Sequence, residues 1–174
     1  SEGAELTVLP EYWSIMGLRD TDKVAFAEEP GNGVLQNFLK QMAQELQMTI
    51  VGGTIPLQSN DSHKIYNACL VFDPSGTQIA RYDKIHLFGF TNGEESYQDS
   101  NTIQAGKDIV NFDSAVGKVG LGFVSTFATI SSFFISLTKT IFVFSSTSFS
   151  LFLIIIHAKI GPTTSRLTNI TTIS

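Results

Sequence analysis

The chain has 174 residues, a formal net charge of −5 at pH 7, a pI near 5.1 and 43% hydrophobic residues. This length suffices for one domain with a hydrophobic core but is short for two. The acidic balance excludes a general nucleic-acid binder and a polybasic membrane-surface protein, because both present a basic face to phosphate groups. The single cysteine, Cys69, excludes an intramolecular disulfide and a cluster of cysteine metal ligands.

Charged residues are distributed unevenly along the chain. Only three of them, Lys139, Lys159 and Arg166, lie after residue 118, and Ser, Thr, Phe and Ile dominate that part. The chain begins with Ser-Glu-Gly, without a basic segment followed by an apolar one. We therefore expect no secretory signal and a cytoplasmic location, and we interpret the missing initial Met as the loss of an upstream part of the gene product.

The first elements along the chain are expected to be a strand, a helix and a second strand. Residues 4–9 predict a short strand that ends at Pro10 and Glu11. Residues 32–47 carry apolar side chains at intervals of three and four, which predicts an amphipathic helix. Residues 48–53 then predict a buried strand that two glycines close.

Further strands follow the helix. Residues 65–72 predict a strand, the Asp-Pro-Ser-Gly segment at 73–76 predicts a turn, and residues 77–82 predict the returning strand of a hairpin. Residues 92–101 are polar and acidic and predict a loop of the kind that lines binding sites. Residues 118–123 begin one more apolar strand. This order indicates an α/β fold with a mixed sheet.

Two side chains next to predicted strands are candidates for chemistry. Glu11 directly follows a strand and is flanked by aromatic residues, so its carboxylate could serve as a general base. Lys84 lies in a segment that contains the apolar Ile85 and Leu87 and could point inward, where its charge would stabilise an oxyanion. Taken singly, each is better explained as an ordinary solvated surface residue.

Four motifs occur in one order along residues 1–122. They are Leu-Pro-Glu at 9–11, Phe-Asp-Pro-Ser-Gly at 72–76, Arg-Tyr-Asp-Lys-Ile-His-Leu-Phe at 81–88 and Gly-Lys-Val-Gly-Leu-Gly at 117–122. This succession resembles the nitrilase superfamily of carbon–nitrogen hydrolases, in the branch of the omega-amidases and deaminated-glutathione amidases. The lysine motif is the most specific of the four.

The resemblance implies an α-β-β-α sandwich, of which this chain holds a part, and a homo-oligomeric parent protein. It implies hydrolysis of non-peptide C–N bonds in small carboxamides through a Glu-Lys-Cys triad, with no metal or organic cofactor. Glu11 would be the general base and Lys84 would stabilise the tetrahedral intermediate. A second acidic residue is expected after the lysine motif, and Asp99 is the nearest match, with Glu94 and Glu95 as competitors.

The nucleophilic cysteine of the triad is missing. It is expected near Val124, where the chain reads Phe-Val-Ser-Thr-Phe over residues 123–127. Cys69 lies in the middle of a strand, where we expect a buried structural thiol. Ser125 offers a much weaker oxygen nucleophile. The three histidines show no metal-ligand spacing, and the sequence places them at His63, His86 and His157.

The resemblance and the charged composition end at the same point, which a frameshift would explain. Gly-Phe-Val at 122–124 can be written GGG TTT GTT, and a shifted frame of that codon string contains Val-Cys. The alternative is a membrane segment, because the windows 119–138 and 140–156 are apolar. These windows are also rich in Ser, Thr and β-branched residues, which makes them prone to aggregate as strands.

The sequence therefore predicts a partial carbon–nitrogen hydrolase domain over residues 1–122 and an aberrant, low-complexity tail of out-of-frame origin over residues 123–174. We expect the chain to be inactive because the nucleophile is absent, and the intact parent to act on a small-molecule amide. A pseudoenzyme that binds without catalysis, or a protein with a membrane tail, remains the alternative. We also expect residues 1–118 alone to expose an apolar sheet face and to be marginally stable.

Overall fold

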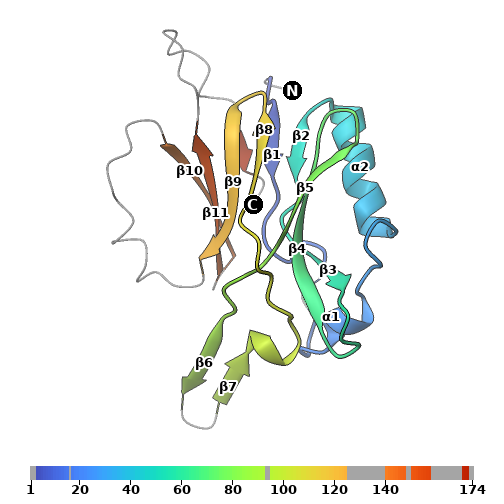
Figure 1. Cartoon of the computed structure of the whole chain (residues 1–174), viewed down its shortest axis with the longest axis vertical. Helices are drawn as coiled ribbons and strands as arrows, with labels where there is room; N and C mark the ends of the chain where they lie inside the picture. The colour runs from blue at the N-terminus through green and yellow to red at the C-terminus, as the bar shows by residue number, and fades with distance from the viewer. Residues whose placement is uncertain are drawn as a thin grey trace.

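A computed structural model shows an α/β fold in which two β-sheets pack face to face and a helix covers the outer face of the first sheet (Figure 1). The structure describes residues 3–15, 17–92, 95–124, 140–147, 150–157 and 170–172. The order of layers is helix, sheet, sheet. This arrangement is the partial sandwich that the resemblance implies.

The strands of the first sheet are β1 (Leu6–Val8), β2 (Thr49–Val51), β3 (Ile55–Gln58), β4 (Ile65–Phe72), β5 (Gln78–Asp83) and β12 (Ile170–Thr172). Their order is β12-β1-β2-β4-β3, and β5 also pairs with β4. The pairs β1–β2 and β1–β12 are parallel, whereas β4 is antiparallel to β2, β3 and β5. The sheet is mixed, as the sequence predicts.

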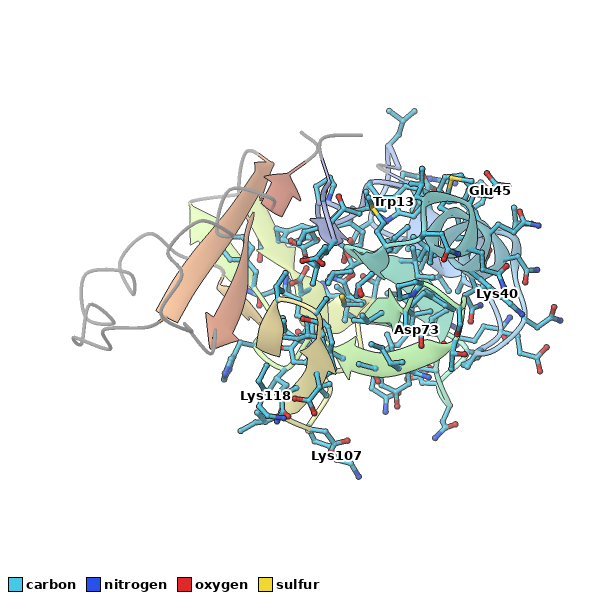
Figure 2. The ribbon with its side chains drawn as sticks, turned by 90° about the horizontal axis from the view of Figure 1, so that it is seen from above. Trp13, Lys40, Glu45, Asp73, Lys107 and Lys118 are labelled. Carbon is cyan, nitrogen blue, oxygen red and sulfur yellow. The ribbon has the colours of Figure 1, made fainter. Side chains whose placement is uncertain are left out.

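The helices are α1 (Asp22–Ala25) and α2 (Val34–Leu46). Helix α2 connects the parallel strands β1 and β2 and buries Leu39 and Ala43 against the outer face of the sheet. On the exposed side of the helix Lys40 and Glu45 point away from the sheet (Figure 2), and the apolar Val34 and Phe38 are exposed as well. The helix ends at Gln47, whose φ of 52° lies in the left-handed region.

The second sheet contains β8 (Val110–Ser114), β9 (Gly117–Val124), β10 (Thr140–Thr147) and β11 (Ser150–His157) in the order β10-β11-β9-β8. All three neighbouring pairs are antiparallel. Phe112, Val119 and Leu121 of this sheet pack against the inner face of the first sheet. In the full chain these three side chains cover part of the apolar face of the first sheet, and the exposed face expected of residues 1–118 alone stays a prediction. The marginal stability of that shorter segment stays a prediction.

Strand β4 serves both cores because successive side chains point to opposite faces of a strand. Cys69 and Val71 face the second sheet, whereas Leu70 and Phe72 belong to the cluster under α2. This double burial explains why β4 has a nearly continuous apolar sequence.

A separate two-stranded ribbon projects from the lower end of the molecule (Figure 1). It consists of β6 (Gly89–Asn92) and β7 (Glu95–Gln98), followed by the 3₁₀ helix η1 (Asp99–Asn101). In the described part of the chain these two strands pair only with each other. The expectation of a loop over residues 92–101 is therefore wrong, because Thr91, Asn92, Glu95 and Ser96 lie in an antiparallel register.

The other strand predictions are confirmed with shifted ends. Strand β4 has the predicted bounds, the hairpin partner β5 begins one residue later, and β1 is shorter than the expected 4–9. The sequence analysis missed β3 and β8. In the described residues no helix is long and apolar enough to cross a membrane. The window 140–156, considered above as a membrane helix, forms β10 and β11, whereas residues 125–138 lie outside the described part.

Candidate active site

The chain turns sharply after β1, and this turn points Glu11 into the protein. Tyr12 has a φ of 52°, in the left-handed region that a non-glycine residue rarely adopts. The Tyr12 backbone N–H donates to Oγ1 of Thr54 at 2.9 Å, and the indole N–H of Trp13 donates to the carbonyl of Gly52 at 2.8 Å. These bonds hold the turn, and Glu11 is only 3% exposed.

Gly53 allows the strand ends to approach this turn. Its φ is 56°, and a Cβ atom built there would lie 2.0 Å from the carbonyl oxygen of Pro10. A side chain at position 53 would therefore displace the backbone that carries Glu11.

Lys84 directly follows β5 and is 2% exposed. Its backbone is fixed on both sides, because its N–H donates to the carbonyl of Asn67 at 3.0 Å and its carbonyl accepts from Gly106 at 2.9 Å. The ammonium Nζ lies 3.2 Å from Oε1 of Glu11 and 3.1 Å from Oδ2 of Asp99. One buried cation thus bridges two buried carboxylates.

Asp99 comes from η1 at the base of the ribbon, and both of its oxygens accept hydrogen bonds. Oδ2 accepts from Lys84 and from the backbone N–H of Phe88 at 2.9 Å, and Oδ1 accepts from the hydroxyl of Tyr97 at 2.9 Å. A carboxylate held in this way is a fixed counter-charge for Lys84. Among its competitors, Glu94 and the side chain of Glu95 lie outside the described residues.

Asn67 is a fourth member of the cluster that the sequence analysis missed. It is fully buried in β4, and its Nδ2 donates to Oε1 of Glu11 at 2.7 Å. Oε1 of Glu11 therefore accepts hydrogen bonds from both Asn67 and Lys84, whereas Oε2 accepts none from the described residues. The signal was present in the sequence, since Asn67 is the polar residue within the apolar run 65–72.

Two tyrosines beside the cluster are held in their neutral form. Burial, and then the neighbouring carboxylates of Glu11 and Asp99, raise the pKa of Tyr12 far above its ordinary value. Burial and the Asp99 carboxylate raise the pKa of Tyr97 in the same direction. Both phenols therefore stay protonated over the whole ordinary pH range.

Cys69 cannot replace the missing nucleophile. Its side chain is completely buried in the core between the sheets, and burial strongly raises the pKa of its thiol. A thiol acts as a nucleophile only as the thiolate, so this environment makes it inert. Ser125 lies outside the described residues, and β9 ends at Val124. In the described segments no group of His, Cys, Asp and Glu could hold a metal ion, and His63 and His86 are exposed.

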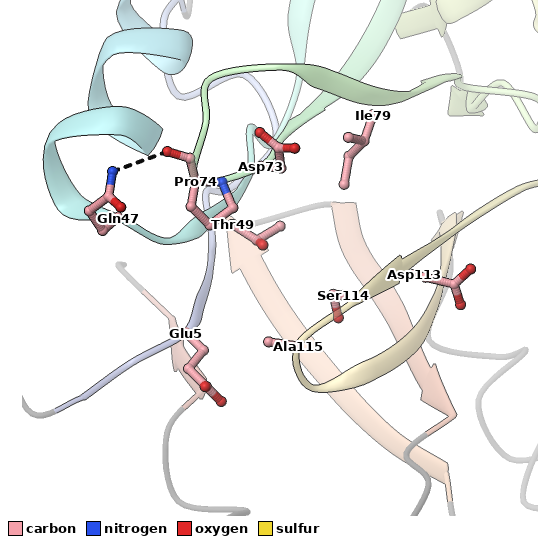
Figure 3. A pocket seen from close by; sticks show the side chains of 9 residues that line it. All are labelled: Glu5, Gln47, Thr49, Asp73, Pro74, Ile79, Asp113, Ser114 and Ala115. Carbon is pink, nitrogen blue, oxygen red and sulfur yellow. Dashed lines mark hydrogen bonds between the residues drawn. The ribbon is translucent and has the colours of Figure 1, made fainter.

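A hollow of about 450 Å³ elsewhere on the surface is lined by nine residues, among them Glu5, Asp73 and Asp113 (Figure 3). Two of these carboxylates already have partners. Asp73 accepts three hydrogen bonds from its own turn, and Asp113 pairs with Lys118 at 2.9 Å. The hollow is lined by none of the four residues of the buried cluster, so it is separate from the candidate active site.

The chain belongs to the carbon–nitrogen hydrolase family, whose model matches residues 1–126. It is similar to human omega-amidase NIT2, with 37% identity over 125 residues that make up 70% of this chain and 43% of that protein. It is also similar to the chloroplastic omega-amidase of Arabidopsis thaliana, with 35% identity, covering 70% of this chain and 34% of that protein.

Solved structures show the same fold. Saccharomyces cerevisiae Nit3, a member of branch 10 of the nitrilase superfamily, superposes with a TM-score of 0.54 and 27% identity over 66% of this chain and 40% of that chain. The C. elegans NitFhit protein superposes with a TM-score of 0.58 at 22% identity, over 66% of this chain and 28% of that chain. The chain spans less than half the length of each of these relatives.

Proposed function

We propose that residues 1–122 are part of a hydrolase that cleaves the C–N bond of small carboxamides, and that this chain cannot complete the reaction because the nucleophile is absent. The observation that carries the proposal is the buried Lys84 bridging Glu11 and Asp99. An omega-carboxamide is the favoured substrate class, because human and Arabidopsis omega-amidases are among the relatives.

In the intact enzyme, a cysteine thiol would transfer its proton to Glu11, and the sulfur would attack the amide carbon. The free oxygen Oε2 of Glu11 suits this role, since Oε1 already accepts from Asn67 and Lys84. The ammonium of Lys84 would stabilise the oxyanion. Glu11 would then return its proton to the amide nitrogen, so that collapse of the tetrahedral intermediate breaks the C–N bond and releases ammonia. A water molecule would hydrolyse the thioester that remains, which yields the carboxylate and restores the thiol.

At the position where the motifs predict this cysteine, the chain has Val124, which has no group that can attack carbon. We therefore propose that the Glu–Lys–Asp cluster is built but not used. A frameshift near residue 122, a homo-oligomeric parent and a cytoplasmic location remain predictions, as does the domain boundary at residue 122.

Ammonia release from succinamate tests this proposal on the purified full chain. We expect no release above the level of the matched Lys84→Met variant. Ammonia that forms in proportion to the chain, and that the Glu11→Gln variant abolishes, would overturn the claim of inactivity.

A second candidate is a pseudoenzyme that binds a small amide. It is favoured by the buried contacts of Glu11 with Asn67 and Lys84, and of Lys84 with Asp99, in a chain without the nucleophile. Calorimetric titration with succinamate distinguishes the two: saturable heat that disappears in Lys84→Met supports binding without hydrolysis, and no heat favours the damaged enzyme.

A further inference from the structure

A second buried lysine lies beside the candidate site. Lys23 of α1 is 8% exposed and forms an ion pair with Asp20. Its Nζ also lies 5.6 Å from the ring centre of Tyr12 and 5.9 Å from that of Tyr97. The motifs of the family resemblance do not include this lysine, and the reaction described above does not use it.

Tyr97 links this ion pair to the candidate site. Its hydroxyl lies 2.9 Å from Oδ1 of Asp99, 3.3 Å from Oδ1 of Asp20 and 3.5 Å from Nζ of Lys23. A second bond fixes Asp20, because Oγ1 of Thr102 donates to its Oδ2 at 2.8 Å. The ion pair thus contacts the chain on both sides of Asp99.

The ribbon that carries Asp99 needs such an anchor. Strands β6 and β7 pair only with each other among the described residues, and an isolated two-stranded ribbon is marginally stable in water. Asp99 lies at its base, where its backbone N–H donates to the carbonyl of Phe88 at 2.8 Å. The orientation of Asp99 therefore depends on what holds this base to the rest of the fold.

We propose that Asp20, Lys23 and Tyr97 form a clamp that fixes the β6–β7 ribbon to the body of the protein and so positions the Asp99 carboxylate against Lys84. They are positioning residues, since the ion pair with Lys84 is made by Asp99 and they act through it. The relevance of the clamp to catalysis rests on the proposed function. The clamp itself is a property of this chain and is measurable without turnover.

The test uses amide hydrogen exchange of the full chain, read at the backbone N–H groups of Asp99 and Ile103. Both are hydrogen-bonded at the base of the ribbon, to Phe88 and Asp99 respectively. Tyr97→Phe keeps the ring and removes the hydroxyl, and Lys23→Met removes the charge. We expect each to speed exchange at both amides about tenfold, with β4 amides unchanged. Lys118→Met is the matched control, because its ion pair is exposed.

Two further variants separate a clamp from general loosening. Lys23→Arg keeps the charge and should exchange within about twofold of the unsubstituted chain. The double variant Tyr97→Phe/Lys23→Met should exchange no faster than the faster single variant, because both disrupt one clamp. Unchanged exchange in the single variants, equal acceleration in β4, failure of Arg to rescue, or additive effects would each overturn the proposal. Ammonia release plays no part in these readouts, so failure of the hydrolase proposal is distinguished from failure of the clamp.

Discussion

Replacing Lys84 by Met is expected to cost about 3–5 kcal/mol of folding stability, the range for breaking a buried ion pair on one side. Without Lys84 the carboxylates of Glu11 and Asp99 would lose their counter-charge. The loss is costly because their side chains are only 2% and 4% exposed, so water cannot solvate the charges instead. Neither can reach water without moving the turn after β1 or the base of the ribbon. Asn67 and Phe88 would still donate to them, but neutral donors do not replace a positive charge.

Denaturant unfolding at pH 7, followed by the fluorescence of Trp13, measures this cost. Trp13 is a suitable probe because it is the single tryptophan and lies two residues after Glu11. The matched control is Lys118→Met, whose side chain is 54% exposed and whose loss should cost less than about 1 kcal/mol. The triple variant that adds Glu11→Gln and Asp99→Asn should recover part of the loss. Equal, small effects of the two lysine substitutions would refute a buried cluster.

Three further outcomes follow from burial and backbone geometry. Cys69, whose thiol pKa burial raises, should resist a thiol-specific reagent such as DTNB in the folded chain and react fully in denaturant; fast labelling of the folded chain would contradict its placement. Because the folded-state pKa values of Tyr12 and Tyr97 lie above the ordinary value near 10, the stability from their neutral forms is present below about pH 10 and is lost as the pH rises further. Absorbance at 295 nm should then show these two phenols ionising only with unfolding, and their ionisation in a folded chain would be the contrary result. Gly53→Ala should destabilise by more than about 1 kcal/mol in thermal unfolding, because its Cβ would collide with Pro10, and an unchanged midpoint would show that the turn can move.

Local patterns predicted most of the fold that surrounds the site. The interval of apolar residues gave α2 to within two residues, and the Asp-Pro-Ser-Gly turn gave the β4–β5 hairpin. Strand β3 was not predicted because it is short and lies close to β2. Only two glycines and a threonine separate the two strands. The β6–β7 ribbon was not predicted because its residues are as polar as those of a loop. Its pairing depends on hydrogen bonds between the two segments rather than on burial.

The cluster itself was only partly accessible from the sequence. Glu11 and Lys84 were candidates because they stand in motifs, and Asp99 because the resemblance implies a second acidic residue after the lysine motif. The structure brings the three together, although their catalytic roles remain proposals. Asn67 lies 56 residues along the chain from its partner Glu11, and Lys23 lies 74 residues from Tyr97. No local pattern identifies such contacts, because they exist only once the two strands and the ribbon have assembled.

We propose that a carbon–nitrogen hydrolase has lost its nucleophile at the end of β9. Resequencing the coding DNA across codons 115–175 and its flanks tests it most directly. We expect a second reading frame that restores a cysteine near position 124 and continues as hydrolase sequence, and the protein expressed from that frame should release ammonia from succinamate. A confirmed single frame that continues as written would contradict the frameshift and leave the pseudoenzyme as the interpretation of residues 1–122.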